Sequence, residues 1–407
     1  MAIDNKDKKV LKSSIEREQN EVACSAECEK IKGSKNLNVP HLRFPEFSGE
    51  WKKCIIQDYG EVITGNTPPT NNAEYYNNGS YLWASPADLG TGKKINDTKT
   101  KLSESGFKKT RIIPKGSILV TCIGSTIGKI GMAVETMSSN QQINSIIVNE
   151  KSNNDFVYYA ISRAFPRYLS EVGVQAVPIL SKSNFEKLPN YTTSIEEQDK
   201  TGYFLNLLDE RIATQNKIIE KLQSLIKGIA QHCIKESTSG NTYVKLGDIC
   251  QITTGKLDAN AQVDNGIYPF FTCAEQPFKI DSFAFDTEAL LISGNGANLG
   301  YINYYHGKFN AYQRTYVLDI FSENIQYIKW ALKVLLPKRI AIEKSSSNTP
   351  YIVLSTLSDL RLPIPNKSIQ CHIAKLMQSL ERKLSSQIAL NGSYNRLKQY
   401  LLRQMFI

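Results

Sequence analysis

The chain has 407 residues, of which 41% are hydrophobic and 22% are charged. This balance excludes a disordered protein, and no apolar run approaches the roughly 20 residues that a membrane helix needs. The formal net charge of +10 favours a polyanionic partner, and eight cysteines are too sparse for a disulfide framework. Because the start of the chain lacks the apolar core of a signal peptide, we expect a cytoplasmic protein with free thiols.

The dominant feature of the sequence is an internal duplication, with a period far longer than the roughly 20 to 50 residues of a solenoid repeat. The segment DYGEVITG at 58–65 recurs as DICQITTG at 248–255, and ILVTCIGSTIG at 118–128 recurs as LLISGNGANLG at 290–300. Each copy has the size of a domain that buries its own core. The expected fold class is α+β, with two similar domains that are each followed by a long α-helix. In chain order we expect a polar N-terminal extension without an assigned role (1–37), a first domain (38–195), a first long helix (196–238), a second domain (239–367) and a second long helix (368–407).

A basic segment lies inside the first domain, at residues 93–115, and contains eight lysines and arginines but only two acidic residues. Such a run is often only a solvated face, but aromatic and short polar residues surround this one. Side chains of these kinds suit contact with phosphates, which position a protein on DNA without reading its sequence. In the second domain, the polar run that begins at Lys344 is the expected counterpart.

The glycine-rich segment GSTIGK at 124–129 has a lysine directly after its second glycine, as a phosphate-binding loop does, but it lacks the other features of such a loop. Its glycines are one residue too close together, and no Ser or Thr follows the lysine. The second copy, GANLGY at 296–301, lacks the lysine, so we interpret both segments as turns between strands. The four histidines lack metal-ligand spacing, and no methyltransferase or dinucleotide motif is present. The sequence therefore predicts no catalytic site, metal or cofactor in this chain.

Each domain is followed by a tail with a helical apolar pattern. The first tail starts with acidic residues, as helices commonly do, and then carries an apolar heptad seam that Gln215 interrupts. In the second tail, Gln387 occupies the position that corresponds to Gln215. We predict that the two helices pair as an antiparallel coiled coil; the alternative is that each helix packs on its own domain. The predicted seam consists of Leu205, Leu208, Ile212, Gln215, Ile219, Leu222, Ile226, Ile229, Leu380, Leu384, Gln387, Leu397 and Leu401.

Four features in a fixed order extend from Asn38 to Ile407. They are LRFPEFSGEW at 42–51, the Asp-to-Gly opening of each domain, the Glu197-Gln198 helix start, and the Leu-rich helix that ends in Met405-Phe406. In this order the chain resembles the specificity subunit of type I restriction-modification systems. The resemblance implies two target-recognition domains that each read one half of a split DNA target, and two helices that dock two modification subunits. It also implies that S-adenosylmethionine, ATP and Mg bind to the modification and restriction subunits.

Two DNA-recognition domains held by one pair of helices are expected to contact half-sites that lie roughly one turn of the DNA double helix apart. Positions that both domains share suit scaffold roles, so we expect discrimination where the copies differ, chiefly at 71–115 and 262–285. The candidate DNA-binding residues are Asn66, Thr67, Lys93, Lys94, Lys99, Lys101, Lys108, Lys109, Arg111, Ser125, Thr126 and Lys129 in the first domain, and Lys256, Asn298, Tyr301, Arg314, Lys344, Ser345 and Ser346 in the second.

Two other classes of protein share some of these features. A stand-alone DNA-binding or scaffold protein that dimerises through its coiled coil would also be basic and duplicated. A DNA methyltransferase in one chain would bind S-adenosylmethionine without a partner.

Overall fold

The computed structural model describes residues 38–172, 179–236, 242–344 and 351–407. These residues form two compact units: the first contains the chain up to Ile212 together with Tyr394–Ile407, and the second contains Ala213–Ser393. The extension expected at 1–37 lies outside the described residues. Among the residues that are described, no helix has both the length and the apolar character needed to cross a membrane. The six described cysteines are free.

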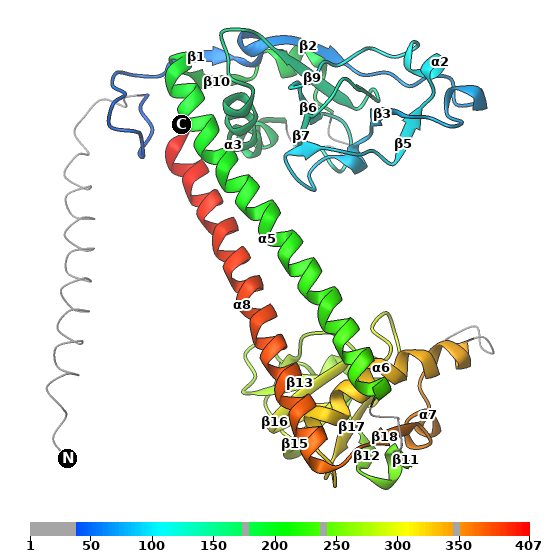
Figure 1. Ribbon diagram of the computed structural model, residues 1–407. Helices are drawn as coiled ribbons and strands as arrows, with labels where there is room; N and C mark the ends of the chain where they lie inside the picture. Colours follow the sequence, from blue (N-terminus) through cyan, green and yellow to red (C-terminus); the bar gives the residue numbers. More distant parts are fainter. Residues whose placement is uncertain (1–37, 173–178, 237–241, 345–350) are drawn as a thin grey trace, which may run out of the picture. The chain divides into compact units, whose positions relative to one another are not determined.

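The first unit is built around a five-stranded sheet (Figure 1). In order across the sheet, its strands are β2 (Gly60–Thr64), β9 (Ile143–Val148), β6 (Ile118–Thr121), β7 (Ile130–Ala133) and β4 (Lys94–Ile95). Strand β6 has the sequence ILVT and buries all four side chains, as expected for a strand that is covered on both faces. The helix α3 (Asn154–Val172) contributes Phe156, Tyr159 and Ile161 to the same core.

Smaller elements complete the first unit. A second sheet has the order β5 (Thr100–Leu102), β3 (Tyr81–Ala84) and β8 (Ser138–Ser139), and β1 (Lys52–Ile55) pairs antiparallel with β10 (Pro189–Thr192). The short helices are η1 (Ile56–Tyr59), η2 (Ala73–Tyr75), η3 (Pro86–Asp88), α2 (Glu104–Phe107) and α4 (Lys182–Glu186).

The second unit contains a six-stranded sheet. In order across it, the strands are β12 (Gln251–Thr254), β17 (Thr315–Asp319), β15 (Phe285–Ser293), β16 (Ile302–Ala311), β13 (Tyr268–Phe271) and β14 (Phe278–Ile280). The helix α6 (Ile325–Lys344) packs Tyr327, Ile328 and Leu332 into the core of this unit. The remaining elements are β11 (Thr242–Lys245), which pairs with β18 (Arg361–Ile364), and η4 (Leu246–Asp248), η5 (Ala259–Ala261) and α7 (Leu354–Ser358).

The two sheets confirm the duplication that the sequence predicts. The order β2-β9-β6-β7 in the first unit corresponds to β12-β17-β15-β16 in the second, and each sheet is followed by a long helix, α3 or α6. The copies differ beyond this shared part. Residues 71–115 form β3, β4, β5 and three short helices, whereas residues 262–285 form the hairpin of β13 and β14.

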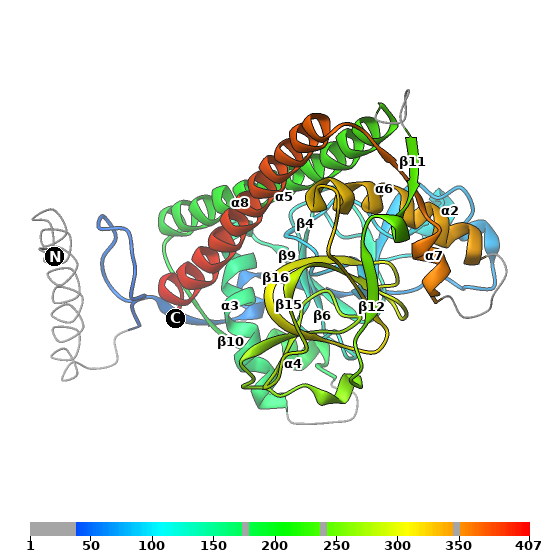
Figure 2. The same cartoon turned by 90° about the horizontal axis from the view of Figure 1, so that it is seen from below.

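The two long helices are α5 (Ile195–Glu236) and α8 (Lys367–Met405), with 42 and 39 residues. They were expected at 196–238 and 368–407. Figure 1 and Figure 2 show them side by side. In the first unit, Asp209 pairs with Lys398 and Arg211 donates to Tyr394, so the contact runs antiparallel, as predicted. The helix ends join the domain cores, because Leu205 and Leu401 lie in the first core and Ile226 and Met377 in the second.

One residue of the predicted seam differs from the others in its burial. All of its other members are buried or half-buried, but 45% of Leu397 is exposed. An α-helix turns once every 3.6 residues, so a strict heptad pattern drifts around a straight helix. As a result Tyr394, Lys398, Leu402 and Met405 lie on the covered side of α8 in place of Leu397.

Candidate nucleic-acid interface

At one end of the first sheet, two predicted residues lie beside Gln141. Asn66 and Thr67 follow β2, and Gln141 precedes β9, its antiparallel neighbour. The Thr67 hydroxyl donates to Gln141 Oε1 at 2.5 Å. The amide of Asn66 donates to the carbonyl of Lys109 at 2.9 Å and accepts from the backbone N–H of Arg111 at 2.7 Å. Asn66 therefore attaches the basic segment to the end of the sheet. Its side-chain N–H and its carbonyl oxygen both have hydrogen-bond partners within the protein, which indicates a scaffold role.

The glycine-rich segment of the first unit is a turn between β6 and β7, as the sequence predicts. Gly124 and Gly128 have φ values of +97° and +89°, which glycine adopts without strain. A Cβ on Gly128 would lie 2.7 Å from Phe165 of α3, so the turn sits directly on the helix. The turn exposes Ser125 and leaves Thr126 and Lys129 half-buried.

The second unit repeats this arrangement with other side chains. Gly296 and Gly300 also have positive φ, and the backbone N–H of Gly294 donates to the carbonyl of Arg314 at 2.8 Å. Asn298 donates to the carbonyl of Cys273 at 3.0 Å, which indicates a scaffold role for this amide. Three of the predicted side chains at this end of the sheet are exposed: Lys256, Tyr301 and Arg314.

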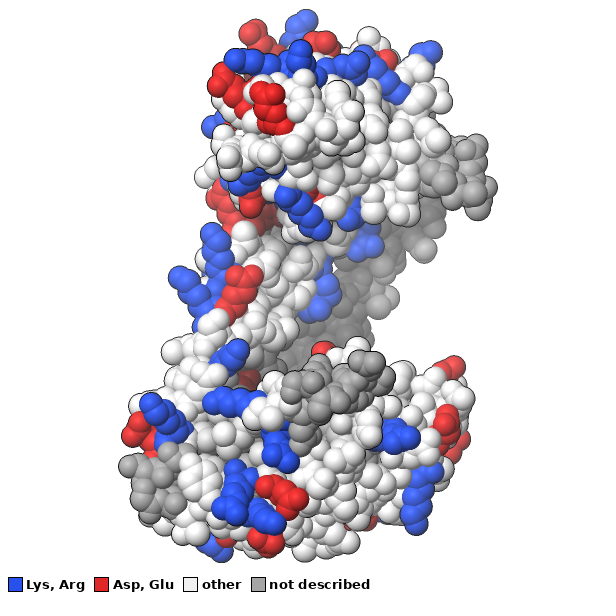
Figure 3. Space-filling view, turned by 90° about the vertical axis from the view of Figure 1, so that its right-hand side faces the viewer, with Lys and Arg blue, Asp and Glu red and all other residues white. Residues whose placement is uncertain are grey.

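Most of the predicted basic residues of the first unit are at the surface. Five of them are exposed: Lys94, Lys99, Lys108, Lys109 and Arg111; Lys101 is half-exposed. Some are already paired, because Lys108 contacts Glu104 at 2.6 Å, Lys101 contacts Asp97 at 2.9 Å and Lys94 contacts Glu210 at 3.4 Å. On the face shown in Figure 3, basic side chains are interspersed with acidic ones over each unit. The contact of these lysines with DNA stays a prediction.

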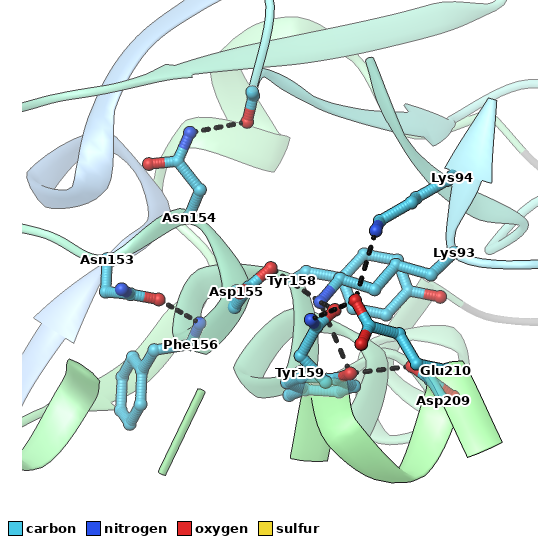
Figure 4. Close-up of polar contacts among 12 residues, drawn as sticks. Lys93, Lys94, Asn153, Asn154, Asp155, Phe156, Tyr158, Tyr159, Asp209 and Glu210 are labelled. Carbon is cyan, nitrogen blue, oxygen red and sulfur yellow. Dashed lines mark hydrogen bonds and ion pairs between the residues drawn. The ribbon is translucent and has the colours of Figure 1, made fainter. Parts of the chain in front are cut away.

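Lys93 requires a correction. It is only 7% exposed, and its ammonium contacts Asp155 of α3 at 2.5 Å (Figure 4). The ammonium also donates to Asn206 of α5 at 2.8 Å. Burial lowers the pKa of Lys93, and the neighbouring Asp155 carboxylate opposes that change. A lysine held in this way has no free amine for a phosphate, so its position contradicts the predicted DNA contact. The sequence pattern misled because it counts lysines without showing which of them point inward.

Of the other predicted contacts of the second unit, the structure describes Lys344 alone. Lys344 is the last residue of α6, and Ser345 and Ser346 lie outside the described residues. Within the described part of the chain, no group of three His, Cys, Asp or Glu residues is arranged to hold a metal.

A family model described as the type I restriction modification DNA specificity domain matches residues 48–224 and 238–391. The chain belongs to this family. The specificity subunit of the type I restriction enzyme EcoDI from Escherichia coli is 42% identical over 143 residues, which are 35% of this chain and 32% of that protein. The MjaIX specificity subunit from Methanocaldococcus jannaschii is 26% identical over 381 residues, 82% of this chain and 88% of that protein.

The fold of this specificity-family chain also resembles solved structures. The crystal structure of a type I restriction-modification system S subunit from M. genitalium matches with a TM-score of 0.63 and 19% identity, over 91% of this chain and 99% of that chain. At this identity the likeness concerns the fold alone.

Sequence reasoning missed a buried hydrogen-bonded cluster around Glu197 in this chain. Arg43 holds both oxygens of Glu197 at 2.6 and 2.7 Å, and the Trp51 indole N–H donates to Glu197 Oε1 at 3.2 Å. Burial raises the pKa of Glu197, but hydrogen bonds from Arg43, Thr193 and Trp51 outweigh it and lower the pKa. The sequence did contain a signal for this cluster: LRFPEFSGEW at 42–51 and Glu197-Gln198 are two of the four features in which the chain resembles specificity subunits. The structure shows that they contact each other.

Sequence reasoning also missed an exposed apolar face on α5. Tyr203 and Leu207 in the first unit are 63% and 45% exposed, and Ile218 and Leu225 in the second are 44% and 55% exposed. Their spacings of 4, 11 and 7 residues are each close to a whole number of helical turns, so they share one side of the helix. On α8, Leu376 is 44% exposed and Leu390 is 39% exposed. Apolar residues in excess of the seam were the signal that could have revealed this face.

Proposed function

We propose that this chain is the DNA-recognition subunit of a type I restriction-modification complex and reads a bipartite target through its two domains. The observation that carries the proposal is the pair of sheet ends at repeat-related positions, where each unit presents exposed basic and polar side chains on the same scaffold. The strands and the turn glycines of the two scaffolds correspond, but the elements at 71–115 and 262–285 differ. Two readers of this kind recognise two different half-sites, so the target is not required to be palindromic.

We further propose that the helices dock two modification subunits. The apolar residues exposed on one side of α5, together with those exposed on α8, support this role, because apolar side chains exposed to water are available to be covered by a protein partner. In this proposal the chain is non-catalytic and works in the cytoplasm. S-adenosylmethionine binds to the modification subunits, and ATP and Mg act with the restriction subunit.

The test is to sequence the methylome of cells that carry the complete system, with and without this chain. We expect one bipartite adenine-methylated motif that disappears when the chain is absent. Exchanging residues 38–195 for the corresponding domain of a relative should change one half of the motif only; a change in both halves would contradict the two-reader model.

A second measurement separates the proposal from its alternative. Mixing the purified chain with the modification subunit should give a stable complex. If no complex forms while sequence-specific DNA binding persists, the chain is a stand-alone DNA-binding protein. If the isolated chain binds S-adenosylmethionine in a calorimeter, the non-catalytic assignment is wrong.

A further inference from the structure

We propose that Lys93 is a positioning residue. It attaches residues 71–115, the segment that differs between the two copies, to α3 and α5, and it thereby fixes where the first domain contacts its half-site. The inference rests on the proposed function, because a half-site is meaningful only for a DNA reader. It assigns Lys93 a role distinct from that of its exposed neighbour Lys94.

The contacts of Lys93 join elements that are distant in the sequence. Its backbone carbonyl accepts from the N–H of Met132 in β7 at 2.7 Å, which attaches it to the main sheet. Its ammonium reaches Asp155 in the first turn of α3 and Asn206 in α5, and it lies 4.5 Å from the ring centre of Tyr159. One side chain therefore links the segment before β4 to both helices that cover this region.

The link continues into α8. The Tyr159 hydroxyl donates to Asp209 at 2.6 Å, and Asp209 pairs with Lys398 at 2.5 Å. Figure 4 shows Lys93, Asp155, Tyr159 and Asp209 converging in one cluster. A partly buried cluster in which each of these charges has a partner permits few arrangements, since a shift leaves a charge without its partner.

The second unit uses a related pair from different elements. Lys329 of α6 contacts Glu381 of α8 at 2.7 Å, and Lys333 contacts the same carboxylate at 3.2 Å. The same number of residues separates Asp209 from Glu381 as separates Gln215 from Gln387, so the two acids correspond in the repeat. Among the residues that the structure describes, a buried lysine comes from the segment that differs between the copies in the first unit but not in the second. Lys93 is therefore placed to couple that segment to the shared helices.

The experiment compares Lys93→Met, Asp155→Asn and Lys94→Met in the full chain assembled with its modification subunit. Methylome sequencing reports half-site bases and spacer length, and DNA binding is measured against salt concentration. We expect Lys93→Met and Asp155→Asn to slow methylation of the native target roughly tenfold or more. We also expect both to admit targets with a neighbouring spacer length, with unchanged half-site bases and an unchanged salt slope. Lys94→Met should instead lower the slope by roughly 0.9, as the loss of one phosphate contact would.

The sign of the Asp155→Asn effect separates positioning from DNA contact. If Lys93 touched phosphate, removal of a nearby negative charge would tighten DNA binding, and Lys93→Met would lower the salt slope; either result overturns the inference. Wild-type spacer choice in both variants overturns it as well. Lys93→Arg keeps the positive charge and should methylate targets with the native spacer length. An effect on folding alone would not predict this result.

The design also separates this inference from the proposed function. If the wild-type complex methylates no motif, the proposed function fails. The positioning role can then still be tested by amide hydrogen exchange, which should be faster in α3 and around Asn206 in Lys93→Met than in wild type. Unchanged exchange in these segments would overturn it.

Discussion

Gln215 of α5 donates its side-chain amide to Gln387 Oε1 of α8 at 2.8 Å. These two glutamines occupy the same position in the two copies of the repeat, and Gln215 is only 4% exposed. The helices therefore meet at residues that the duplication relates to each other. A polar pair inside an otherwise apolar seam fixes the register of the helices at some cost in stability.

Replacing one of these glutamines should destabilise the protein, whereas replacing both should not. Gln215→Leu leaves the amide of Gln387 without its partner, which costs about 1–3 kcal/mol. The double variant Gln215→Leu with Gln387→Leu removes the polar pair and should unfold at or above the wild-type temperature. Thermal denaturation of the two single variants and the double variant gives the coupling between them, and additive effects would contradict the observed hydrogen bond.

Glu197→Gln should unfold more easily than wild type, by about 3–5 kcal/mol, because it leaves the Arg43 guanidinium without its acid. The side chains of Glu197 and Arg43 are 2% and 13% exposed. The matched control is Glu104→Gln, in an exposed pair with Lys108, which should change the melting temperature little. Equal effects of the two substitutions would show that burial of the Arg43 pair does not matter.

Because of the same Glu197 carboxylate, the stability of the protein should depend on pH in the acidic range. The folded-state pKa of Glu197 is lowered, since its hydrogen bonds outweigh the opposing effect of burial. Its contribution is therefore present above the unfolded-state pKa and is lost as the pH falls through the folded-state pKa. Melting temperatures measured across that acidic range should fall less steeply for Glu197→Gln than for wild type.

Glycine to alanine should have opposite effects at two positions. At Gly128, positive φ and the Phe165 ring oppose a Cβ, so alanine should destabilise by about 1–3 kcal/mol. At Gly228 in α5 a Cβ meets open space, so alanine should stabilise by roughly 0.5–1 kcal/mol. Urea denaturation measures both. Stabilisation at Gly128 would contradict the turn geometry.

Lys109→Ala should weaken DNA binding similarly for all sequences and lower the salt slope by roughly 0.9, as expected for one lost phosphate contact. Lys109 is exposed on the segment that Asn66 anchors. Lys182→Ala is the control, because Lys182 is an exposed lysine outside the predicted contacts. An unchanged slope for Lys109→Ala would remove this residue from the interface.

Leu207→Asp should abolish or weaken assembly with the modification subunit without a large loss of stability, since this side chain is 45% exposed. Ile267→Asp changes an equally apolar residue that is 78% exposed outside α5 and α8, and it should assemble normally. Analytical ultracentrifugation of each variant mixed with the modification subunit measures assembly. Normal assembly of Leu207→Asp would move the docking surface elsewhere.

The sequence by itself determined the duplication, the two long helices and the apolar periodicity along them. These features rest on periodic patterns and turn glycines, which depend on local geometry and recur in both copies. Leu397 marks the limit of such reasoning, because a small drift in helical phase exposes it although its spacing fits the heptad.

Only the tertiary structure decided which polar residues are free to bind. Lys93 and Lys94 are neighbours of the same type, yet one amine is enclosed by α3 and α5 and the other is exposed. Asn66 and Arg43 likewise acquire their roles from residues 43 to 154 positions away. The enclosure of a side chain depends on which distant segments pack around it, and one-dimensional spacing does not contain that information.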